Sequence, residues 1–315
     1  MLNVLVPLDG SELAERAISH ALPIVESFVA KVTLLRVITP AEFRSQETFD
    51  RVDWRLHKHQ AFTYLRNVAQ TFETATVPFE LRVEEGRPAD VILETARELG
   101  TQLLVMSTHG RGGAVDYPRG GVASKTLSGF GGSVLLVGSG VIKKAATKVH
   151  YRRLLVPIDG SHRSECAMRV AMMLAKSLDA ELVIACIAEQ PELPHIVRDD
   201  RKAASLHRDL ADLTRAAAER RLHEIEAQIP EEIALRTAVL LARRPADELS
   251  AAVRRFDADL LIASENLFNG SLGSLDRQMA GTQVPTFILS PKSIGSAFCE
   301  LRTAEGDDVA NADVI

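Results

Sequence analysis

Short, nearly all-apolar runs alternate along this chain with longer segments whose apolar residues recur every three or four positions. The runs 2–8 and 102–106 are typical of strands buried on both faces of a parallel sheet. The segment 12–29 has the period of an amphipathic helix, although Pro23 lies inside it. Strands that alternate with helices predict a doubly wound α/β fold with right-handed crossovers.

Two sets of such elements follow one another. In the first half we expect the strands 2–8, 31–38, 79–83, 102–106 and 133–137, and the helices 12–29, 51–74 and 89–99. In the second half we expect the strands 153–158, 181–188, 233–240 and 259–263, and the helices 201–228 and 246–255. A further helix before the strand 181–188 is marked by Val170, Met173, Leu174 and Leu178. The helix 51–74 is predicted to turn one apolar side to the sheet, formed by Trp54, Leu56, Phe62, Leu65, Val68 and Phe72.

The two halves are copies of each other. Val4–Ser11 returns as Leu154–Ser161, and Leu103–Ser107 returns as Leu260–Ser264. The turn Gly86-Arg87-Pro88-Ala89-Asp90 also returns, as Arg243-Arg244-Pro245-Ala246-Asp247. Landmarks in the same order indicate that a whole domain was duplicated. We therefore expect one domain at 1–140, a second at 151–291 and a flexible acidic tail at 292–315.

Composition fits two globular domains. The chain has 315 residues, of which 46% are hydrophobic, and a formal net charge of −5. This mildly acidic balance argues against nucleic acid as a partner. The cysteines Cys166, Cys186 and Cys299 form no C-x-x-C pair, which argues against a disulfide framework or a cysteine zinc site. With no targeting segment or membrane-length apolar run in the sequence, we expect a cytoplasmic protein.

A glycine-rich stretch stands between a strand and a helix. Ser107–Gly113 and Gly120–Val122 follow the strand 102–106, and Ala123 begins a helical pattern. Glycine allows close backbone approach, and a helix N-terminus offers free N–H groups and partial positive charge, which together suit a phosphate. The alternative is a long surface loop that needs glycine only for flexibility. No Walker A sequence is present.

The sequence resembles a tandem universal stress protein over 1–138 and 153–290. The landmarks are the opening Val-Pro-Leu-Asp-Gly-Ser, the turn Gly86–Asp90 and the glycine stretch. ATP-binding members of that family carry G-x2-G-x9-G-(S/T) in this stretch. Here Ser107 replaces the first glycine, Gly110 and Gly120 keep the x9 spacing, and Gly121 replaces the final Ser/Thr.

The resemblance implies, for each domain, a five-stranded Rossmann-like sheet of order 3-2-1-4-5 with helices on both faces. It implies that the first domain binds ATP or a related adenine nucleotide, with Mg²⁺ as the accompanying cation. The implied binding residues are Pro7, Leu8, Asp9, Val37, Met106, Ser107, His109, Gly110, Arg111, Gly120, Gly121 and Val122. Gly121 lacks the hydroxyl of the Ser/Thr in the family motif. A hydrogen bond from that hydroxyl to a charged phosphate would contribute about 1–3 kcal/mol, so we expect weakened nucleotide binding. Ser107 is tolerated only if its φ is negative.

The second copy of the glycine stretch has diverged. Leu267 takes the place of Gly110, the next glycine-serine pair at Gly273 comes sooner, and Glu265 adds negative charge. We therefore expect no triphosphate cradle in this domain. Asp159 is retained, and an N-cap is the favoured interpretation for it.

Three functions remain open. The favoured one is a stress-response binding and signalling protein. Its degenerate second domain would pack on the first as a pseudo-dimer, through the fifth strands. Two such chains could also form a homodimer. A slow ATP hydrolase would need a base or metal ligand, for which only His109, Asp9 and Asp116 offer themselves. The third is an interaction scaffold without nucleotide.

The spacing of His57 and His59 could suggest a metal pair. On a helix their side chains diverge by about 200°, so we interpret them as part of a solvated helix face.

Overall fold

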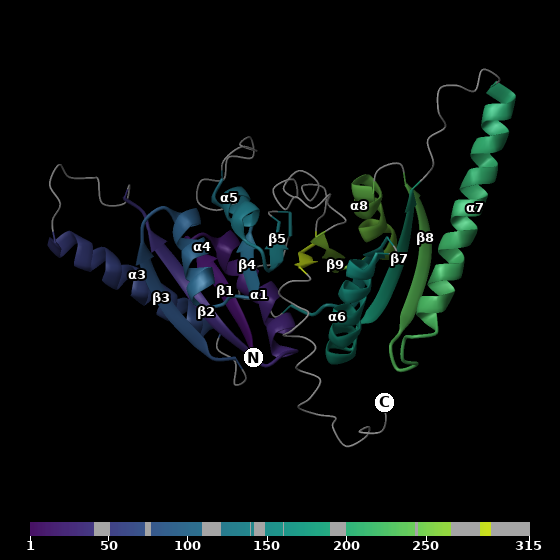
Figure 1. Cartoon of the computed structure of the whole chain (residues 1–315). Coiled ribbons are helices and arrows are strands. Elements are labelled where there is room, and N and C mark those ends of the chain that lie inside the picture. The colour runs from purple at the N-terminus through teal and green to yellow at the C-terminus, as the bar shows by residue number, and fades with distance from the viewer. Residues whose placement is uncertain are drawn as a thin grey trace, which may run out of the picture.

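The computed structural model describes residues 1–40, 51–72, 77–108, 121–138, 140–141, 149–159, 161–189, 200–242, 245–265 and 284–290. Strands and helices alternate through both halves of the chain (Figure 1). The strands of the first half are β1 Leu2–Leu8, β2 Ala30–Ile38, β3 Phe79–Glu85, β4 Leu103–Ser107 and β5 Ser133–Val137. Its helices are α1 Glu12–Glu26, α3 Arg51–Thr71, α4 Pro88–Glu98 and α5 Val122–Gly129.

The second half repeats this succession. Its strands are β6 Arg153–Ile158, β7 Glu181–Glu189, β8 Leu235–Ala242, β9 Leu260–Ser264 and β10 Thr286–Leu289. Its helices are α6 His162–Leu178, α7 Asp200–Glu226 and α8 Pro245–Phe256. Most bounds lie within two or three residues of the predicted ones, and the predicted tandem α/β fold is confirmed.

All ten strands form one sheet of order β3-β2-β1-β4-β5-β10-β9-β6-β7-β8. Within each half the neighbouring strands are parallel and follow the predicted order 3-2-1-4-5. The two halves meet where β5 pairs antiparallel with β10, with Phe287 opposite Leu135. Ser290 strengthens this junction, because its backbone N–H donates to Ser133 Oγ at 3.1 Å and its hydroxyl donates to the Gly131 carbonyl at 3.0 Å.

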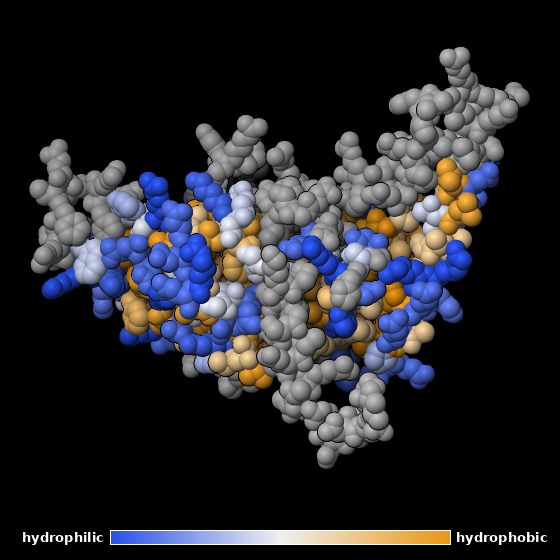
Figure 2. Space-filling model, viewed as in Figure 1, coloured by the Kyte–Doolittle hydropathy of each residue, from blue (hydrophilic) through white to orange (hydrophobic). Residues whose placement is uncertain are grey.

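Alternate residues of each strand pack on opposite faces of the sheet. In β1, Val4 and Val6 belong to a core that also contains residues of α1 and α3, whereas Leu5 packs with α4 and α5. In the second half α6 and α7 join the first core, and α8 packs on the other face with Leu155. The visible surface of the described residues is largely hydrophilic (Figure 2), as expected when each helix turns one side to the sheet.

The apolar side predicted for α3 is partly wrong. Leu65, Val68 and Phe72 are buried, but Leu56 and Phe62 remain 51% and 38% exposed. The reason is the place of α3 at the end of the sheet, where β3 is the outermost strand and no further described strand lies beside it. Helix α1 is also shorter than predicted, since the Ser27 N–H and hydroxyl bond carbonyls of its last turn.

A second buried contact joins the halves outside the sheet. Tyr151, which precedes β6, donates its hydroxyl to the His20 carbonyl of α1 at 3.1 Å, and this oxygen lies 3.0 Å from His20 Nδ1. Both side chains are 3% exposed. Each polar group therefore satisfies the other inside an otherwise apolar contact.

Candidate functional site

The strand order of the first half reverses between β1 and β4. The chain leaves β1 for α1 on one face of the sheet and leaves β4 toward α5 on the other face. In parallel α/β sheets, the carboxyl ends of two such strands flank a crevice that is the usual ligand position. Asp9 follows β1 directly, and Ser107 ends β4. The fold thus brings the two segments singled out in the sequence to the same edge of the sheet.

The turn after β1 is held by its own side chains. Asp9 Oδ1 accepts from the Ser11 N–H at 2.9 Å and from the Ser11 hydroxyl at 2.6 Å. The Ser11 oxygen in turn accepts from the Ala14 N–H at 3.2 Å, so Ser11 is the N-cap of α1. Gly10 has a φ of 82°, a conformation that glycine adopts without strain. Asp9 therefore orients the turn and does not cap the helix itself.

A tyrosine that the sequence did not point to lies near this turn. Tyr64 of α3 donates to Glu15 Oε1 at 3.0 Å. Burial, followed by the nearby charges of Glu15 and Asp9, raises the pKa of Tyr64 well above its usual value, so the phenol stays protonated and keeps donating. Arg36 of β2 stands beside Leu8 in the sheet and opposes this effect. The available signal was an arginine near the end of a mostly apolar strand.

The helix α5 begins with a glycine cap. Gly121 is its N-cap, with φ −63° and ψ 157°, and makes no side-chain capping bond. A Cβ built at Gly121 meets no atom within 4 Å among the described residues. Neither the backbone angle nor the available space requires glycine here. Free N–H groups at such a terminus can donate to an anion.

The other predicted residues have different environments. Leu8, Val37 and Met106 are buried core side chains, with 3%, 5% and 5% exposure. Pro7 is half-buried, and Val122 is 41% exposed. Ser107 is not among the residues with positive φ, so the condition set for it from sequence is met. The remaining predicted binding residues, and Asp116, lie outside the described residues: His109, Gly110, Arg111 and Gly120.

The turn after β6 repeats the turn after β1. Asp159 Oδ1 accepts from the Ser161 N–H at 2.9 Å and from its hydroxyl at 2.7 Å. Ser161 caps α6, so the interpretation of Asp159 as the N-cap is wrong. Partial burial, the largest influence, raises the pKa of Asp159, but the hydrogen bonds from Ser161 and Ser164 outweigh it and leave the pKa below its ordinary value.

Charges around the second turn are arranged differently. Cys186 stands beside Ile158 in the register that Arg36 occupies beside Leu8. Arg221 of α7 contacts Glu165 at 3.2 Å and supplies a cation from the helix side. Burial raises the pKa of the Cys186 thiol, against the lowering effect of Arg221.

An ion pair also crosses the second crevice. Glu265, directly after β9, lies with its carboxylate 3.4 Å from Arg163 Nη1 of α6. The corresponding residue of the first half, Thr108, is uncharged and donates its N–H to the Val137 carbonyl at 3.0 Å. A carboxylate at this edge of the sheet disfavours a phosphate nearby.

Across the described ranges, no three or more His, Cys, Asp or Glu residues gather in a way that could hold a metal ion. None of the helices within those ranges combines the length and apolar content needed to cross a bilayer.

Comparison with known proteins agrees with this geometry. The model of the universal stress protein family matches residues 1–138 and again residues 150–265. The chain belongs to the universal stress protein family. A family member from Methanocaldococcus jannaschii is 28% identical over 138 residues, which is 43% of this chain and 81% of that protein.

Solved structures extend the similarity over both repeats. A universal stress protein from Archaeoglobus fulgidus has a TM-score of 0.64 at 18% identity, covering 91% of this chain and 96% of its own. A functionally unknown protein from Pseudomonas aeruginosa PAO1 has a TM-score of 0.50 at 13% identity, covering 95% and 96%. At these identities the comparison shows that this chain shares the fold of those two proteins.

Proposed function

We propose that the first repeat of this universal stress protein binds ATP or a related adenine nucleotide, and that the chain serves as a stress-response binding and signalling protein. The observation that carries the proposal is the reversal of strand order between β1 and β4, with the glycine-capped N-terminus of α5 following β4. In parallel α/β sheets this point of the sheet suits a nucleoside, and a helix N-terminus suits its phosphates.

Each part of the crevice would have its own role. Asp9, Pro7 and the end of β2 at Val37 would line the adenosine pocket. The backbone N–H groups of Gly110, Gly120, Gly121 and Val122 would hold the phosphates, as the family motif implies. Asp9 is well suited to a positional role, because its contact with Ser11 already fixes the carboxylate in one orientation.

The second repeat would carry no nucleotide. The Glu265–Arg163 ion pair supports this asymmetry, since it puts a carboxylate where a phosphate-binding loop would begin. We also propose that the domains 1–140 and 151–291 act together as a pseudo-dimer. The β5–β10 pairing and the Ser290 contacts support that arrangement, and a homodimer of two such chains is compatible with it.

Calorimetry with ATP and native mass spectrometry of the purified chain test the proposal. We expect one adenine nucleotide per chain and a loss of binding in Asp9→Ala. Asp159→Ala makes the matched change in the second repeat and should leave nucleotide binding unchanged. No heat at millimolar ATP would sink the proposal, and two nucleotides per chain would show that the second repeat was misjudged. Phosphate release from the same samples distinguishes a binding protein from a hydrolase.

A further inference from the structure

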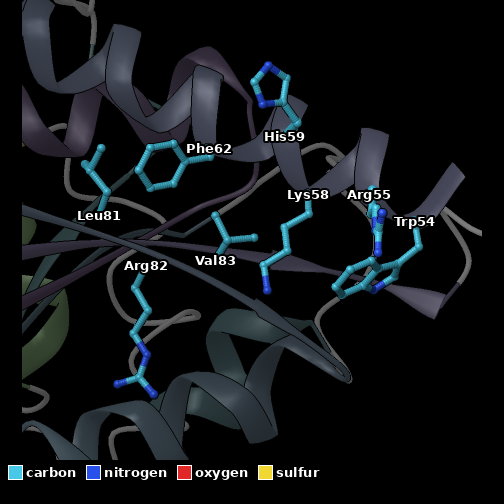
Figure 3. A pocket seen from close by; sticks show the side chains of 8 residues that line it. All are labelled: Trp54, Arg55, Lys58, His59, Phe62, Leu81, Arg82 and Val83. Atoms are coloured by element: carbon cyan, nitrogen blue, oxygen red, sulfur yellow. The ribbon is translucent and has the colours of Figure 1, made fainter. Parts of the chain in front are cut away.

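A groove separate from the nucleotide crevice lies between α3 and the edge strand β3 (Figure 3). Its volume is about 400 Å³, which falls in the range of small-molecule sites. The eight residues that line it come from these two elements alone: Trp54, Arg55, Lys58, His59, Phe62, Leu81, Arg82 and Val83. The nucleotide crevice adjoins β1 and β4, so β2 separates the two sites within the sheet.

The groove has an apolar floor and aromatic walls. Leu81 and Val83 are half-buried residues on the same face of β3, because they stand two positions apart on a strand. Trp54 and Phe62 lie on α3 above this floor, and Phe62 is 38% exposed (Figure 3). These aromatic and aliphatic side chains form a surface on which a flat ring could stack.

Positive charge gathers at the same place. The Lys58 ammonium lies 5.1 Å from the centre of the Trp54 ring, in a cation–π contact. Within the described part of the chain, neither Lys58 nor Arg55 forms an ion pair with a carboxylate. Arg82 differs, since its guanidinium contacts Glu84 at 2.7 Å and Glu98 at 2.5 Å and points away from α3 (Figure 3). Lys58 and Arg55 therefore bring positive charge to this groove, in a chain whose net charge is −5.

We propose that this groove binds a small anionic aromatic molecule, such as an aromatic carboxylate, sulfonate or phosphate. Its ring would lie over the apolar floor between Trp54 and Phe62, and its anionic group would meet Lys58 and Arg55. A solvated helix face that merely carries long cationic side chains would offer no such preference for an anion with a ring. The experiment must therefore measure whether the groove prefers a ligand that has both an aromatic ring and an anionic group.

The test uses the whole chain and the probe 8-anilinonaphthalene-1-sulfonate. Trp54 is the single tryptophan of the chain, so energy transfer from tryptophan to the bound probe reports on this groove. We expect saturable binding near Trp54 that weakens at least about tenfold in Arg55→Glu/Lys58→Glu, because the two substitutions replace attraction to the anionic group with repulsion. The neutral analogue N-phenyl-1-naphthylamine should bind more weakly than the sulfonate and should not respond to the substitutions.

Two controls separate this site from the others. Arg215→Glu/Arg254→Glu makes the same change in net charge on exposed positions of α7 and α8 and should leave the probe affinity unchanged. Asp9→Ala should also leave it unchanged, because Asp9 directly follows β1 and does not line the groove. Circular dichroism confirms that each variant is folded. Equal binding of the two probes, unchanged affinity in the double variant of the groove, or a loss of probe binding in Asp9→Ala would overturn the proposal.

Discussion

Gly121→Ser should tighten nucleotide binding by the first repeat. The substitution restores the hydroxyl that the family motif carries at the start of α5. The site accepts it, because φ is −63° and an added Cβ meets no described atom within 4 Å. Serine is also a better N-cap than glycine, but only by a few tenths of a kcal/mol, so the stability of the fold should hardly change.

The gain in affinity follows from one new hydrogen bond. A bond to a charged acceptor contributes about 1.5–3 kcal/mol, which corresponds to an affinity gain of roughly 10-fold to more than 100-fold. Gly121 is exposed, so water competes for the hydroxyl and the lower end of this range is expected. Calorimetric titration with ATP measures the effect.

Gly121→Ala is the matched control, because it adds the same Cβ without the hydroxyl. It should bind ATP no more tightly than the wild-type chain. The reasoning fails if the serine and alanine variants bind ATP equally well, since the hydroxyl would then make no contact with phosphate. It also fails if both variants lose binding, because the space around Gly121 would then be needed by the ligand.

Two further predictions concern stability. Asp159 has a lowered pKa in the folded chain, so its contribution is present above the unfolded carboxyl pKa of about 3.9 and is lost as the pH falls through the folded value. Denaturant unfolding of Asp159→Asn should therefore show a deficit near neutral pH that shrinks below about pH 4, and a deficit independent of pH would contradict this account. Tyr151→Phe should destabilise the chain by about 1–3 kcal/mol, because it removes the buried hydroxyl that donates to the His20 carbonyl and lies 3.0 Å from His20 Nδ1. Thermal unfolding measures this loss, and an unchanged midpoint would show that the contact between the repeats contributes nothing.

Much of the fold could be predicted from local pattern. Apolar runs such as 102–106 have few alternatives to a buried strand, and the repeated landmarks indicated two copies of one domain. The resemblance at Val4–Ser11 and at the glycine stretch led to the correct family and the correct strand order. These features were accessible because periodicity and turn residues act over a few neighbouring positions.

The charge arrangement of the crevices depended on tertiary structure. No local pattern indicates that Tyr64 reaches Glu15 or that Glu265 meets Arg163, because these partners are far apart in the chain. The strand register shows that Cys186 stands where Arg36 stands in the first repeat. The cation of the second repeat comes from Arg221 of α7 instead.

The sequence by itself determined the alternation of elements, the duplication, the family and the candidate phosphate loop. The tertiary structure decided that Ser11 and Ser161 cap their helices while the aspartates brace the turns. It also decided that the repeats join through β5 and β10, and that Phe62 lines a groove instead of the core. The physical reason is that burial and partner choice depend on which elements meet in space, and α3 lies over the outermost strand of the sheet, where fewer described elements surround it.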